Sequence, residues 1–102
     1  MSYRRAMPYA AKIILHTPIA APAKLDSFVE ACLADSVVLV AVFGTDADKV
    51  EGLIDELVVG DASDESRFVM TSSHRNCSLD EVLDFVTSYD AVPGAQIEQV
   101  RF

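Results

Sequence analysis

The sequence predicts a small α/β domain, in which a mainly parallel four-stranded sheet is covered by three helices in two or three layers. Four short segments rich in apolar or β-branched residues alternate with three segments whose apolar residues recur at helical spacing. Strands joined by a helix of this length lie parallel, with right-handed crossovers. The hydrophobic fraction of 51% is that of an ordinary globular protein. We therefore expect the order β-α-β-α-β-α-β in a single α/β domain of residues 1–102.

The first half of the chain predicts two strands and the helix between them. Residues 11–16 form a short apolar segment that ends at Thr17 and Pro18, as is typical of a strand followed by an extended loop. Residues 37–43 are an uninterrupted run rich in β-branched residues, which predicts a strand covered on both faces. Between them, one apolar helical stripe is expected from Leu25, Phe28, Val29, Cys32 and Leu33.

The second helix is predicted over residues 48–58, which are apolar on one side and acidic on the other. Thr45 or Asp46 has the side chain that a helix prefers as its amino-terminal cap. Gly60 suits the end of the helix, because glycine adopts the left-handed conformation without steric cost.

Two strands and a capped helix are predicted for the rest of the chain. Residues 67–71 predict the third strand, and residues 96–102 predict a weaker last strand. Between them, Ser78 and Glu81 have the spacing of a capping box, so a helix is expected to begin after Ser78.

The sequence leaves the strand order open. A fully apolar segment such as residues 37–43 favours an interior place in the sheet, as in the order 3-2-1-4. The order 2-1-3-4 is also common in Rossmann-like and flavodoxin-like domains of this size.

Charge excludes one class of function and suggests a partner. Acidic residues outnumber basic ones 16 to 8, which gives a net charge of −8, whereas a nucleic-acid binder needs a basic face. The charge is unevenly distributed along the chain. All charged side chains of residues 1–25 are basic, whereas residues 46–65 hold eight acidic residues and one basic residue, Lys49. This asymmetry is consistent with a solvated acidic helix face. It also favours self-association, and we expect a homodimer.

Two further patterns concern the compartment. No segment approaches the ~20 apolar residues that span a bilayer, and Lys12, His16 and Pro18 interrupt what would be the apolar core of a secretory signal. Cys32 and Cys77 fit no Cys-x-x-Cys pattern and are expected to be thiols. We therefore expect a cytoplasmic protein that binds no membrane.

Neither a cofactor nor a metal is predicted. The chain lacks both a Gly-x-Gly-x-x-Gly turn and a Gly-Lys-Ser/Thr loop. His16, His74 and Asp46 are suitable ligand types for a metal, but no two ligands have close spacing such as His-x₃-His.

Polar side chains are concentrated where the predicted strands end, and ligands of open parallel sheets bind at that edge. The candidate ligand-binding residues are Thr71, Ser72, Ser73, His74, Arg75, Asn76 and Ser78 after the third strand, His16 after the first, and Asp46 after the second. The structural alternative is that they are helix caps and hydrogen-bonded histidines.

An anionic ligand is expected at residues 72–78, because a helix start carries partial positive charge and Arg75 adds a full one. His74 would act there as an acid or base, with its pKa raised by the bound anion. His16 would line the same pocket only with the strand order 2-1-3-4. Cys77 is a second catalytic candidate, since a thiol near a helix start can become a nucleophilic thiolate.

Residues 64–74, with the capped helix that follows them, resemble a segment of short bacterial proteins classed as a domain of unknown function. The resemblance covers residues 47–89, and its most distinctive part is the tetrapeptide Thr71-Ser72-Ser73-His74. It implies a small stand-alone α/β protein and no particular activity.

The sequence thus predicts a non-enzymatic binding or regulatory module that self-associates. The alternative is a small enzyme or sensor for an anionic metabolite, bound at residues 72–78 with His74 as the acid or base.

Overall fold

Strands and helices alternate along the chain as the sequence predicts. The computed structural model describes residues 9–20, 22–60, 69–89 and 96–101. Its strands are β1 (Lys12–His16), β2 (Leu39–Phe43), β3 (Met70–His74) and β4 (Ile97–Val100). Its helices are α1 (Leu25–Ala34), which follows the 3-10 turn η1 (Pro22–Lys24), α2 (Ala47–Val59) and α3 (Leu79–Ser88).

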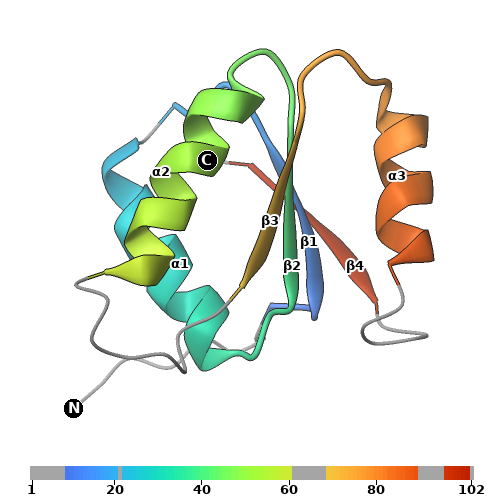
Figure 1. Cartoon of the computed structure of the whole chain (residues 1–102). Coiled ribbons are helices and arrows are strands. Elements are labelled where there is room, and N and C mark those ends of the chain that lie inside the picture. Colours follow the sequence, from blue (N-terminus) through green and yellow to red (C-terminus); the bar gives the residue numbers. More distant parts are fainter. Residues whose placement is uncertain (1–8, 21, 61–68, 90–95, 102) are drawn as a thin grey trace.

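The four strands form one parallel sheet in the order β3-β2-β1-β4. This is the order 3-2-1-4, so the apolar strand β2 lies inside the sheet, as its composition favoured. Strand β2 pairs with β1 on one side and β3 on the other, and β4 pairs with the far side of β1. Strands β3 and β4 are therefore the two edges (Figure 1).

Helices cover both faces of the sheet, which makes the domain three-layered. Helices α1 and α2 lie on one face and α3 lies on the other (Figure 1). Strand β1 shows the alternation that this requires: Ile13 and Leu15 belong to the larger core with α1 and α2, and Ile14 belongs to the smaller core with α3. Burying each of these side chains contributes about 1.5–3 kcal/mol.

The predicted helix ends are only partly confirmed. Ser78 accepts the Glu81 N–H at 3.2 Å and the Glu81 carboxylate accepts the Ser78 N–H at 3.0 Å, which completes the capping box of α3. Gly60 ends α2 with a positive φ of 59°. Asp46 does precede α2, but its side chain makes no capping bond. Backbone contacts close that turn instead, because the Ala47 N–H donates to the Gly44 carbonyl at 3.2 Å.

The third strand ends three residues later than predicted. It spans Met70–His74, so its last three residues belong to the sheet, where the sequence predicted a loop. Of the predicted strand, Arg67 and Phe68 lie outside the described residues. Polar residues are tolerated here because β3 is an edge, and because carboxylates of α2 accept hydrogen bonds from the hydroxyls of Thr71 and Ser73.

Lys12 is a buried charge that the sequence pattern does not reveal. Its side chain is 2% exposed at the start of the interior strand β1. The Nζ donates to the carbonyls of Val86 at 3.0 Å and Tyr89 at 2.5 Å. These carbonyls lie in the last turn of α3 and just after it, where the helix dipole is negative, and the Val86 carbonyl also accepts the Tyr89 N–H at 3.2 Å. Lys12 thus fastens the end of α3 to the sheet.

Replacing Lys12→Met is expected to lower the free energy of unfolding by about 1–3 kcal/mol, because two carbonyls lose a buried donor. Chemical denaturation followed by circular dichroism measures this change. Lys24→Met is the matched control, since Lys24 is exposed, and its effect is expected within about 0.5 kcal/mol. Equal effects of the two substitutions would contradict a structural role for Lys12.

Candidate functional site

The last residues of three strands form a row at the end of the sheet where the strands have their carboxyl termini, called the carboxyl edge below. His16 pairs with Phe43, and Phe43 pairs with His74. Phe43 packs against the core on the α3 side, so the row lies on that face. Since β2 separates β1 from β3, the two histidines stand two strand spacings apart, about 10 Å. The carboxyl edge therefore offers two separate groups of polar residues, one around each histidine.

The first group surrounds an open pocket at the ends of β1 and β4. The pocket has a volume of about 520 Å³ and is lined by His16, Thr17, Pro18, Ala20 and Arg101. The His16 Nε2 lies 2.8 Å from the Gln99 Oε1, and the His16 ring meets the Phe43 ring edge-on at 5.5 Å. Gln99 and Phe43 thus hold the imidazole from two neighbouring strands.

The loop after β1 is fixed against the loop after β2. Thr17 donates to the Phe43 carbonyl from its backbone N–H at 2.8 Å and from its hydroxyl at 3.0 Å. Gly44 follows with a φ of 125°, and a β-carbon added there would lie 2.5 Å from the Thr17 Oγ1. Only glycine fits this approach, so the wall of the pocket at Thr17 is set by the turn at Gly44.

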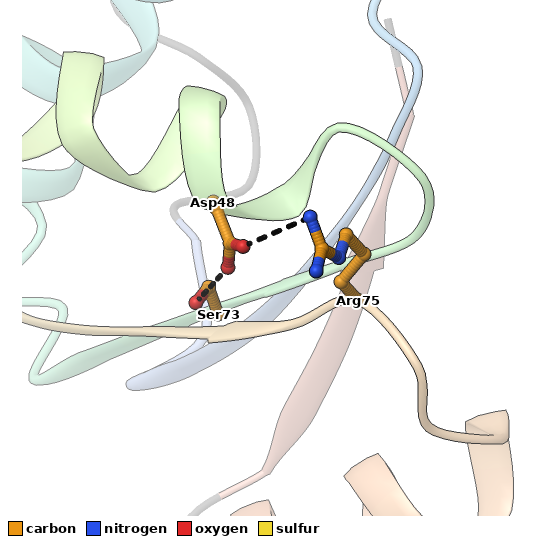
Figure 2. A network of polar contacts seen from close by, with 3 residues as sticks. All are labelled: Asp48, Ser73 and Arg75. Carbon is orange, nitrogen blue, oxygen red and sulfur yellow. Dashed lines mark hydrogen bonds and ion pairs between the residues drawn. The ribbon is translucent and has the colours of Figure 1, made fainter.

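The second group occupies both faces of β3. On the α2 face, the Asp48 carboxylate accepts a hydrogen bond from the Ser73 hydroxyl at 2.7 Å and pairs with the Arg75 guanidinium at 3.6 Å (Figure 2). On the same face, the Thr71 hydroxyl donates to Glu51 at 2.5 Å. The positive charge of Arg75 is therefore already compensated by a carboxylate of α2.

On the α3 face of β3, a serine meets a histidine. The Ser72 Oγ lies 2.9 Å from the His74 Nε2, and the His74 ring lies 4.8 Å from the ring of Phe85. Burial lowers the pKa of His74 below its ordinary value, because a charged imidazole would lose part of its hydration. The neutral ring is therefore favoured near pH 7. The pKa raised by a bound anion, which the sequence suggested, concerns the liganded state and stays a prediction.

The remaining candidates are exposed, packed against the core or used as a helix cap. Ser78 caps α3, and Asn76 and Asp46 are exposed. Cys77 is a free thiol that packs against the core on the α3 side. Nowhere in the described part of the chain do three His, Cys, Asp or Glu side chains come together as they would around a metal ion.

Several residues around these groups were missed by the sequence analysis. Arg101 and Gln99 sit in the weak last strand or just after it, and nothing local marks them. The strand order is the signal that would have found them, because only the neighbour of β1 can reach His16. Glu51 was assigned to a solvated helix face, although it contacts β3.

The His74 ring is expected to titrate with a midpoint below the ordinary histidine value of about 6.5, because burial disfavours its charged form. NMR of the imidazole protons against pH measures the midpoint. Phe85→Ala uncovers the ring and should move the midpoint back toward 6.5. A midpoint at or above 6.5 in the unsubstituted protein would contradict the effect of burial.

Comparison with known proteins adds a family and no activity. Residues 2–101 match a family described as "Domain of unknown function (DUF7684)". The match is wider than the predicted resemblance, which covered residues 47–89. Neither the curated proteins nor the solved structures include a match to the chain. Within the described residues, no helix is long and apolar enough to cross a membrane. Because the family match covers nearly the whole sequence, the chain belongs to the DUF7684 family, a domain of unknown function.

Proposed function

We propose that the protein is a non-enzymatic binding or regulatory module, which takes a small anionic metabolite in the pocket at the ends of β1 and β4. One observation carries the proposal: the pocket coincides with the topological switch point of the sheet. The chain moves from β1 through β2 to β3 in one direction, and then returns to place β4 on the other side of β1. Ligands of open α/β sheets bind beyond the carboxyl ends of the strands at such a point.

The chemistry of the pocket supports an anion. Within the described residues, Arg101 forms no ion pair, so its guanidinium is available for a carboxylate or phosphate. The Gln99 oxygen favours a proton on the His16 Nε2.

The charges around residues 72–78 disfavour an anion there. Arg75 and Ser73 both contact the Asp48 carboxylate, which occupies the place of an acidic ligand and repels one (Figure 2). The amino terminus of α3 carries a partial positive charge, and the Glu81 carboxylate of the capping box already accepts a hydrogen bond there.

A second candidate function rests on the contact between Ser72 and His74. A neutral imidazole 2.9 Å from a hydroxyl can accept its proton, so the proposal of His74 as an acid or base is retained for a small enzyme or sensor. It ranks second because the polar residues beside it are engaged with α2. A cytoplasmic location belongs to both proposals and is supported by the free thiols of Cys32 and Cys77.

Self-association is a separate proposal, supported by the open edge at β3. Within the described residues, β3 pairs with β2 alone, and Met70 and Phe85 beside it are each 41% exposed. An unpaired strand edge flanked by apolar side chains favours pairing with another chain. The carboxylate of Glu51 on the other face of β3 opposes the approach of a second copy, so the association should be weak at low salt.

Inorganic phosphate or malonate, added to the ¹⁵N-labelled protein, is expected to shift the NMR signals of His16, Thr17 and Arg101 saturably. Arg101→Gln should weaken the apparent Kd by about tenfold or more, since it removes a charged hydrogen-bond donor. Arg75→Gln is the matched control, because Arg75 is exposed but already paired with Asp48, and it should leave the Kd unchanged.

The same titration separates the alternatives. Shifts confined to His74 and residues 72–78, abolished by Ser73→Ala, would move the anion site to β3. If Arg101→Gln and Arg75→Gln weaken the Kd equally, binding depends on overall charge alone, and the proposed anion site in the pocket is wrong.

Sedimentation equilibrium at high micromolar concentration is expected to show a dimer whose fraction rises with added NaCl, because salt screens the acidic residues near β3. Met70→Lys should lower the dimer fraction by placing a charge beside the open edge. A monomer under all these conditions would remove self-association from the proposal.

A further inference from the structure

A second concave surface lies between helices α1 and α2, which run side by side on one face of the sheet (Figure 1). It is an open groove of about 510 Å³, lined by Ala23, Leu25, Asp26, Leu53, Glu56 and Leu57. Its apolar surface comes from three leucines and an alanine, and its charge comes from two carboxylates. Such a surface suits an occupant that is apolar in its centre and cationic at its margin.

Leu53 is the most informative residue of the groove. It lies in the middle of α2 and is 41% exposed, whereas Val50, Ile54 and Val58 of the same helix are buried. A single exposed apolar side chain is ordinary on a protein surface, and Val59 at 47% exposed is such a case. Leu53 differs because it lies in a groove beside Leu57, which is partly exposed, above the buried Leu25.

The charge around the groove is mainly negative. Residues 22–60, which contain both helices, hold eight acidic residues against Lys24 and Lys49. The two acids of the groove itself, Asp26 and Glu56, are exposed. No salt bridge among the described residues engages either of them, so both are available to a cation.

We propose that this groove binds a cationic amphipathic helix of a partner protein. Laying the apolar face of a helix into a groove between helices is a recurrent mode of recognition. Leucine-type side chains of the partner would pack on Leu53 and Leu57, and its lysines or arginines would face Asp26 and Glu56. A second copy of this chain fits less well, because its own helices α1 and α2 carry the same negative charge. The proposal is independent of the pocket at β1 and β4.

The test uses a short fluorescent synthetic helix of leucine and lysine, with leucines at helical spacing, and the full-length protein. Fluorescence anisotropy should show binding that Leu53→Asp weakens by at least about tenfold, because it places a charge in the apolar part of the groove. Val59→Asp adds the same charge to an exposed apolar position outside the groove and should leave the Kd unchanged. Glu56→Gln should weaken binding more than Asp55→Asn, since Asp55 does not line the groove.

Circular dichroism checks that each variant is folded, which is expected because all four positions are exposed. Equal Kd values for Leu53→Asp and Val59→Asp would overturn the proposal, because binding would then follow charge alone. Equal binding of a lysine–alanine helix would overturn it as well. If Leu53→Asp instead abolishes dimerisation, or if a peptide of residues 1–8 competes for the groove, the occupant is this chain itself and the partner assigned here is wrong.

Discussion

Strands β1 and β2 carry apolar side chains on both of their faces, and each of those side chains must be removed from water. Helices α1 and α2 can cover one face only, so a third helix is required on the other. Right-handed crossovers place helices on opposite faces only when the chain reverses its direction across the sheet. The return of the chain to β4, on the far side of β1, therefore follows from the need to cover both faces. The switch point that this return creates is where the pocket lies.

The smaller core is held by polar contacts as well as by apolar packing. Only α3 covers that face, and its end is held by the buried ammonium of Lys12 as well as by apolar packing. On the same face of the edge strand β3, Met70 is exposed and His74 is partly exposed. A helix that covers the two central strands does not also cover the edge, which leaves a histidine half-desolvated beside Phe85. The lowered pKa of His74 reflects the part of its ring that is buried.

The negative charge of the chain has different consequences at Arg75 and at Arg101. On α2, Asp48 compensates Arg75 and ties β3 to the helix, so a polar strand can pair at the edge of the sheet. At the opposite edge, no described carboxylate pairs with Arg101. A strongly acidic protein can therefore hold a local site for an anion, because each guanidinium is governed by its nearest partners and distant charges are screened.

The sequence by itself determined the number, type and approximate limits of the elements, because apolar periodicity and capping residues act over a few neighbouring positions. The interior place of β2, the core position of Cys32 and the capping box at Ser78 are local in this sense. The end of β3 was predicted three residues too early, since the partners that stabilise Thr71 and Ser73 in a strand are carboxylates of α2.

Only the tertiary structure decided which strands are neighbours, and with that the composition of the site. An apolar segment reveals that it is buried, but not beside which strand it lies. The order 3-2-1-4 separates His16 from His74 and brings Gln99 and Arg101 to His16 from more than eighty residues away. Likewise, Lys12 looks like any surface lysine until the end of α3 is placed above it. These contacts depend on the packing of the whole sheet, and a pattern of neighbouring residues in the sequence does not reveal them.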